Sequence, residues 1–174
     1  MMIDLLRQRR SIRKFTSEKI PAEFIQVLTE AALRSPSSKG NKPWEFILVD
    51  DPDLLEQLSE VKKSGSAFLK NAPLGIVVCA DSTQSDVWIE DCSIAATIIQ
   101  LEAESLGLGS CWIQFRNRYY NDGKTCEARI QELLGMAEHI KVLSIIAIGY
   151  PAESKPSVPS ENLLKERIKY NRWA

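Results

Sequence analysis

A short basic segment near the N-terminus carries the clearest chemical signal in this chain. Five of the eight residues from Arg7 to Lys14 are basic, although the formal net charge of the whole protein is only -1. Ser11 places a hydroxyl group among these cations. Guanidinium groups and a hydroxyl suit a small oxyanion, because charge-assisted hydrogen bonds are strong and arginine binds phosphate through two of them at once. The segment therefore predicts a phosphate-binding site.

A second block, residues 35–44, reads Ser-Pro-Ser-Ser-Lys-Gly-Asn-Lys-Pro-Trp. Its small and turn-forming residues allow backbone amides to approach a ligand closely, and Ser37 and Ser38 add two hydroxyls. We interpret the two blocks together as a site for flavin mononucleotide (FMN). A solvated helix end or a weak nucleic-acid patch remains the alternative for the first block. A plain loop or a helix cap remains the alternative for the serines.

The composition favours one soluble domain spanning residues 1–174. The chain is 44% hydrophobic and 26% charged, and its length is sufficient to bury a sizeable core. The longest apolar runs, 74–80 and 142–150, are too short to cross a bilayer, and the near-neutral net charge argues against a dedicated nucleic-acid binder. Four cysteines lie in or beside apolar segments without regular spacing. Such cysteines are typical of buried thiols in a reducing compartment, so we expect a cytoplasmic protein.

Helices and strands that could position the two blocks are predicted from apolar periodicity and from glycine and proline signals. Helices are expected over residues 2–9, 21–34, 51–61, 87–106 and 126–134, and strands over 44–49, 74–80, 110–115 and 142–148. The nearly all-apolar segment 74–80 is typical of a strand buried on both faces.

The expected helix over 87–106 is unusual, because its middle, from Cys92 to Ile99, has no charged face. A helix that is apolar or small all round must be covered on every side, which one small domain can hardly achieve. This pattern points to a dimer. The chain also ends in a segment that contains Tyr170 and Trp173, and these rings are expected to dock on this subunit or on its partner.

Several other chemistries are disfavoured. The single histidine, His139, excludes a two-histidine metal site and most catalytic triads. No GxGxxG follows an expected strand, which argues against a Rossmann cofactor site. The acidic pair Glu90-Asp91 lacks a partner pattern for hydrolysis and is expected to be solvated or to cap a helix. The polar residues at positions 114 and 116–118 either line a substrate mouth or form a solvated turn.

Four motifs together resemble the nitroreductase family of flavoproteins. They are RRSIRKF near the N-terminus, PSSKGNKPWEF after the second helix, DCSIAATIIQLEAESLGLGSCWI in the middle, and IGYP before a YNRW tail. The resemblance covers nearly the whole chain in order. It implies an α+β fold with a central, mostly antiparallel sheet flanked by helices, in an intertwined homodimer with its flavins at the interface. The tail, about 151–174, would then pack on the partner subunit.

The resemblance also implies an activity. Family members bind FMN, take hydride from NADH or NADPH and pass it to nitroaromatics, quinones or enones in a ping-pong reaction. A small-molecule acceptor is expected as the reaction partner, with no nucleic acid, membrane or metal. No catalytic protein residue is expected, because the flavin carries the chemistry. The alternatives are a specialised flavin enzyme that dehalogenates aromatics or breaks down flavin, and a non-enzymatic nucleotide- or anion-binding module.

The FMN-binding residues that the resemblance implies fall in three segments. The first would hold the phosphate, ribityl chain and pyrimidine edge, the second would reach the same flavin from the other subunit, and the third is a strand passing near the isoalloxazine ring. They are Arg9, Arg10, Ser11 and Arg13; Pro36, Ser37 and Ser38; and Trp112, Ile113, Gln114 and Phe115.

Two further contacts follow less directly from the resemblance. Many members carry Asn-x-Gln-Pro-Trp, and either Gly40 or Asn41 takes the place of that asparagine here. Many members also grip the phosphate with a basic pair after the last strand, where Lys155 is the candidate in this chain. Arg13 is expected near the N1/O2 edge of the flavin, where a cation would stabilise the anionic reduced ring.

Overall fold

An antiparallel sheet of four strands forms the centre of the molecule, in the spatial order β1-β2-β4-β3. The computed structural model describes residues 1–120 and 123–173. The strands are β1 (Trp44–Val49), β2 (Leu74–Asp81), β3 (Gly109–Gln114) and β4 (Ile140–Gly149). Because β2 and β4 lie in the centre and are buried on both faces, their sequences are nearly continuous apolar runs.

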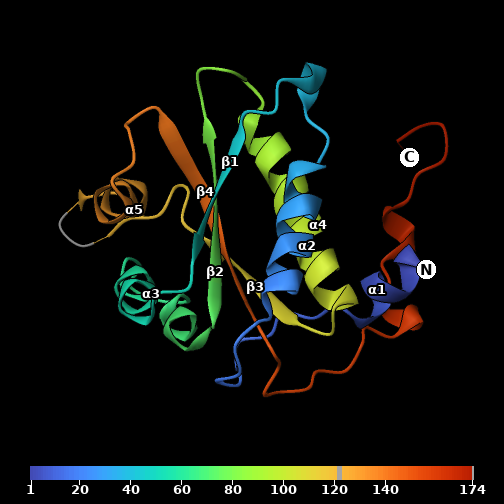
Figure 1. Cartoon of the computed structure of the whole chain (residues 1–174). Helices are drawn as coiled ribbons and strands as arrows, with labels where there is room; N and C mark the ends of the chain where they lie inside the picture. The colour runs from blue at the N-terminus through green and yellow to red at the C-terminus, as the bar shows by residue number, and fades with distance from the viewer. Residues whose placement is uncertain (121–122, 174) are drawn as a thin grey trace.

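Helices cover both faces of this sheet (Figure 1). α2 (Ala22–Leu33) and α4 (Trp88–Ser105) pack on one face, and α3 (Pro52–Ser59) and α5 (Cys126–Leu134) pack on the other, each pair over its own hydrophobic cluster. α1 (Met2–Gln8) packs beside α4. Short 3-10 turns lie at Ser38–Gly40, Ala67–Asn71, Ser160–Asn162 and Lys165–Arg167. No helix in the described ranges is long and apolar enough to cross a membrane.

Local signals in the sequence explain where these helices begin and end. The Asp51 carboxylate accepts hydrogen bonds from the backbone N–H groups of Asp53 and Leu54, which caps α3, and Pro52 occupies its first turn. The Thr125 hydroxyl caps α5 by accepting the N–H of Ala128. At the other end of α5, Gly135 takes a left-handed conformation with φ 64°, which terminates the helix.

The predicted helices and strands are confirmed, with boundaries that shift by at most a few residues. The α+β class and the antiparallel sheet are confirmed as well. Val27 lies outside the buried face of α2 and is exposed. The bulk of that face is supplied by Leu28 and Ala32, which are buried against α4 and the sheet.

In the single subunit α4 is covered on only part of its circumference. Cys92, Ala95 and Ile99 are fully buried against the sheet, whereas Ile94 is 42% exposed and Thr97 is exposed on the outer side. The aromatic rings near the C-terminus do not pack on the subunit, because Tyr170 and Trp173 are about nine-tenths exposed. The expectation that these rings dock on their own subunit is therefore wrong. Docking on a partner stays a prediction.

Candidate functional site

The basic segment lies along the open edge of β3. This strand pairs with β4 on one side only. On its other side the Ile12 N–H donates to the Ser110 carbonyl at 3.0 Å, and Ser11 and Ser110 form a parallel bridge. Because backbone groups alternate in direction along a strand, those of Trp112 and Gln114 also face this open edge. The first motif is thus positioned by the strand that the third motif supplies.

Gly109 permits this close approach. A Cβ atom at position 109 would lie 2.9 Å from the Cβ of Ile12, which is closer than real Cβ contacts. A larger residue at this position would push the basic segment away from β3. The glycine in the sequence LGLGS is therefore explained by packing between the two segments rather than by a turn.

Three cations lie near enough to the Cys111 thiol to act on its pKa, namely Arg9 and Arg13 from the basic segment and Lys155 from the tail. Burial raises the pKa of this thiol, and the positive charges of Arg13, Lys155 and Arg9 act against that rise, as does a hydrogen bond with the side chain of Ser11. Lys155 also donates a hydrogen bond from Nζ to the Ser11 carbonyl. The structure therefore brings Lys155 to the basic segment, and its contact with a phosphate stays a prediction. Together the three side chains form a positively charged corner at the start of β3, the cation corner.

Glu153 organises this corner and was not identified from the sequence. Its Oε1 accepts the backbone N–H of Arg13 at 2.6 Å and that of Lys14 at 3.3 Å, and it forms an ion pair with Lys155 at 3.4 Å. The hydrogen bond from the Arg13 N–H is the main reason that the pKa of Glu153 lies below its ordinary value. Because 140 residues separate the bonded partners, no local pattern could have identified the pair.

Arg10 and Arg13 of the basic segment border two different clefts. Arg10 lines a small cleft of about 180 Å³ together with Glu153 and Lys155. The Arg13 guanidinium lies 5.8 Å from the centre of the Phe68 ring and borders a larger cleft of about 680 Å³. Cation–π contact with Phe68 restrains the Arg13 side chain in this position.

Lys62 lies at the far end of the same strand edge and is a second residue that the sequence analysis missed. Its Nζ donates to the Gln114 carbonyl at 3.1 Å and lies 5.6 Å from the centre of the Phe115 ring. Burial, followed by the positive charge of Arg118, lowers the pKa of Lys62. The open edge of β3 is therefore bordered by cations at both ends.

The predicted strand residues differ in what they can reach. Trp112 is half-buried, and its indole N–H donates to the Gln114 side-chain oxygen at 2.9 Å, so the two side chains form one unit. The Gln114 amide in turn donates to the Arg116 carbonyl. Ile113 and Phe115 are buried in the core on the α3 and α5 side. Only Trp112 and Gln114 are placed to contact a ligand at this edge.

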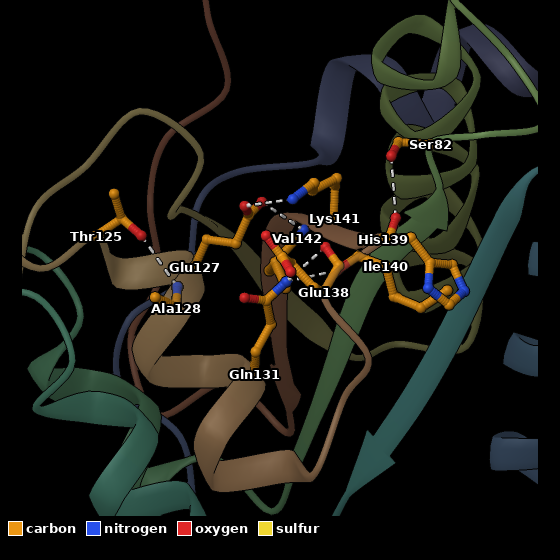
Figure 2. A network of polar contacts seen from close by, with 10 residues as sticks. All are labelled: Ser82, Thr125, Glu127, Ala128, Gln131, Glu138, His139, Ile140, Lys141 and Val142. Atoms are coloured by element: carbon orange, nitrogen blue, oxygen red, sulfur yellow. Dashed lines mark hydrogen bonds and ion pairs between the residues drawn. The ribbon is translucent and has the colours of Figure 1, made fainter.

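The loop after β3 forms one wall of a cleft of about 360 Å³, lined by Trp88, Lys141 and residues 116–119 among others. A polar network fixes the neighbouring α5 to the start of β4 (Figure 2). In it, Glu127 accepts the Val142 N–H at 3.0 Å and pairs with Lys141 at 3.7 Å, while Gln131 donates to the Glu138 and Ile140 carbonyls. The polar run at 116–118 is thus part of a shaped cleft.

The serine block lies at the opposite end of α4 from the basic segment. The Ser38 N–H donates to the Asp91 carboxylate at 2.8 Å, in the first turn of α4, whereas the basic segment contacts Ser110, just after its last turn. A helix of 18 residues spans about 27 Å. Within one subunit the two blocks therefore do not form one site.

Polar contacts hold the serine block in shape. The Ser37 hydroxyl accepts the Lys42 N–H at 2.8 Å, and the Asn41 side-chain amide donates to the Gln84 carbonyl at 3.0 Å. Gly40 has φ 71° and nothing within 4 Å of where a Cβ would stand. Pro36 is exposed. The choice between Gly40 and Asn41 as a ring contact stays open.

Comparisons with known proteins agree with this arrangement. The model of the nitroreductase family matches residues 6–66 and 59–150. The solved structure of an FMN-dependent nitroreductase from Clostridium difficile R20291 is 47% identical, with a TM-score of 0.97 over 98% of this chain and 99% of that one.

Two relatives are named for NADH dehydrogenase/NAD(P)H nitroreductase activity. The protein of Methanothermobacter thermautotrophicus is 38% identical and covers 99% of this chain and 87% of its own length. That of Archaeoglobus fulgidus is 36% identical and covers 98% of each. The resemblance of the four motifs and the predicted fold are thereby confirmed. The chain belongs to the nitroreductase family.

Proposed function

We propose that this protein is an FMN-dependent oxidoreductase that transfers hydride from NAD(P)H, through the flavin, to a small electron-poor acceptor such as a nitroaromatic, quinone or enone. The observation that carries the proposal is the basic segment bonded along the open edge of β3, with Lys155 bonded to the Ser11 carbonyl beside it. The similarity to a structure described as an FMN-dependent nitroreductase supports it.

The residues present fit the two chemical parts of FMN. The cation corner suits the phosphate, since charge-assisted hydrogen bonds contribute about 1.5–3 kcal/mol each and three or four would account for much of the roughly 8 kcal/mol of a micromolar affinity. The outward backbone groups of Trp112 suit the polar edge of a flat ring, because they alternate with groups that are bound to β4. Lys155 and Ser11 border the corner from two sides.

Bound FMN supplies the hydride chemistry, and the chain binds, orients and shields it. Arg13, restrained by Phe68, would supply positive charge at one end of the open edge of β3, and Lys62 would supply it at the other. Positive charge at these positions favours the anionic reduced form of the flavin. Gln114, bonded to Trp112 and held through its carbonyl by Lys62, keeps the strand edge rigid.

The same proposal includes a homodimer of one-domain subunits spanning residues 1–174. Since the serine block lies about one helix length from the basic segment, Pro36, Ser37 and Ser38 reach a flavin only when a second subunit supplies the cations. The exposed Ile94 of α4 and the tail, about 151–174, whose residues 156–173 are exposed, provide surfaces for that partner. The cytoplasmic location stays a prediction.

The test is the visible absorption spectrum of the purified protein, recorded before and after anaerobic addition of NADH and, in a second cuvette, NADPH. We expect a flavin spectrum that bleaches with at least one reductant and returns when a quinone or nitroaromatic is added. A bound flavin that neither reductant bleaches would shift the function to a specialised flavin reaction. A colourless protein that FMN cannot reconstitute would contradict the proposal and favour a non-enzymatic anion-binding module.

A further inference from the structure

Asp91 is a buried carboxylate that the proposed hydride transfer does not use. It lies in the first turn of α4 and is only 2% exposed, so the expectation that it is solvated is wrong. Its Oδ1 accepts the Ser38 N–H at 2.8 Å, and its Oδ2 accepts the Ser85 hydroxyl at 3.2 Å. No lysine or arginine among residues 1–120 and 123–173 forms an ion pair with it.

The burial of the Asp91 carboxylate needs a physical explanation. Removing a carboxylate from water is unfavourable unless hydrogen bonds compensate for the lost hydration. Its neighbours on the buried side of α4, Cys92 and Ala95, show that an uncharged residue satisfies the packing of this helix. The N-terminal end of the helix dipole favours an anion here, but the exposed Glu90 already supplies one. What Asp91 adds is the contact with the Ser38 backbone.

The loop that it contacts needs support. Lys39, Gly40 and Lys42 have φ values of 54°, 71° and 50°, a left-handed conformation that is unfavourable for the two lysines. The block has two other polar anchors, the Ser37 hydroxyl on the Lys42 N–H and the Asn41 amide on the Gln84 carbonyl. The first ties the start of the loop to its end, and the second lies near its end, so Asp91 is the anchor that joins the start of the loop to α4.

We propose that Asp91 is a positioning residue: its carboxylate fixes the backbone at Ser38 and so holds residues 36–38 in the geometry in which they contact the flavin bound by the partner subunit. This rests on the proposed function, which assigns FMN contacts to those residues. Asp91 also ties this loop to α4, whose outer side exposes Ile94. Association through α4 and the shape of the flavin site are thereby linked through one side chain.

The test compares Asp91→Ala with Asp91→Asn and with the control Glu90→Gln, an exposed carboxylate on the same turn. The first readout is NMR-detected hydrogen exchange of the Ser38 amide in the flavin-free protein, and the second is the Kd for FMN. Asp91→Ala should speed that exchange and raise the Kd, each by about tenfold, the worth of one charge-assisted hydrogen bond. Asp91→Asn keeps an acceptor oxygen and should remain within about threefold of wild type.

The outcomes separate this inference from the proposed function. If wild type binds no FMN, the proposed function fails. If wild type binds FMN and a folded Asp91→Ala variant binds it equally well, the inference alone is overturned. Should that variant fail to fold, the wild-type protein decides. A Ser38 amide that exchanges at the unprotected rate in wild type overturns the inference. A Ser38 amide that is protected both in wild type and in Asp91→Asn supports it.

Discussion

Glu153 holds the cation corner together through the Arg13 backbone, and this makes its contribution depend on pH. Its pKa is lowered from the ordinary value of 4.5, chiefly by the Arg13 N–H. A carboxyl with a depressed folded-state pKa stabilises the fold above its unfolded-state pKa, and the stabilisation is lost as the pH falls through the folded value. We therefore expect Glu153→Gln to be less stable than wild type at neutral pH and equally stable in acid.

Urea denaturation of both proteins at about pH 7 and about pH 3 checks this. Glu138→Gln is the control, because that carboxyl is exposed and its residue contributes only a backbone carbonyl to a described hydrogen bond. A difference between Glu153→Gln and wild type that persisted unchanged at about pH 3 would show that the residue acts through packing rather than through its charge.

Lys62 should give a pH dependence of the same sign, but in the alkaline range. Its folded-state pKa is depressed below 10.5 by burial and by Arg118, so the unfolded chain binds more protons than the folded chain in the alkaline range below 10.5. The stability of wild type should therefore gain a contribution as the pH rises through that range. Lys62→Met should remove this contribution, as measured by the difference in urea stability across alkaline pH. Lys63→Met, at the exposed neighbouring residue, should retain it.

These residues show what the sequence could and could not reveal about the site. Arg9, Ser11 and Arg13 are adjacent in the chain, so their charge density was visible directly. Glu153, Lys62 and Asp91 have ordinary neighbours, and the groups that they bind lie 140, 52 and 53 residues away. Long-range hydrogen bonds of this kind leave no local pattern. Only the fold brings the partners together.

At the scale of elements, the contact between the basic segment and β3 depends on a missing side chain. Gly109→Ala would place a Cβ 2.9 Å from that of Ile12, and neither atom belongs to a flexible side-chain end. We expect destabilisation of about 1–3 kcal/mol from overpacking, together with weaker FMN binding as the arginines move away from the strand. Thermal unfolding and the Kd for FMN measure the two effects.

Gly107→Ala is the matched control two residues earlier. Its Cβ would meet nothing within 4 Å, but its φ of 75° is unfavourable for alanine. It should therefore lose stability while keeping the wild-type affinity for FMN. Equal loss of FMN affinity in both variants would mean that the loop conformation, rather than the close approach to Ile12, positions the arginines.

Helices and strands were predictable because their signals are local, as with Asp51 and Pro52 at the start of α3 and Gly135 after α5. The order of the strands was not. β3 follows β2 and a helix in the chain, yet it pairs with β4 and leaves its other edge open. Which strand lies at the edge of the sheet depends on pairings between distant segments. The candidate site lies on the open edge of β3.

At the scale of the whole molecule, the two motifs that were first read as one site lie at opposite ends of α4. The two motifs can form one site only across the two subunits of a dimer. The uncharged middle of α4 is an independent indication of such a dimer. Ile94 on its outer side is the residue to change. A buried unpaired charge opposes association, so Ile94→Glu should sediment as a monomer and lose FMN, whereas Ile94→Val should behave as wild type.

A shared site makes a sharper prediction for mixed dimers. Arg13→Gln subunits lack part of the cation corner, and subunits in which Ser37 and Ser38 are both replaced by leucine lack the reaching loop; each homodimer should bind FMN poorly. In a mixed dimer one site receives both defects and the other receives none. Refolding the two variants together should therefore restore FMN binding to some of the sites, as measured by flavin absorbance after gel filtration. No recovery on mixing, or FMN retained by monomeric Ile94→Glu, would show that each subunit binds the flavin alone.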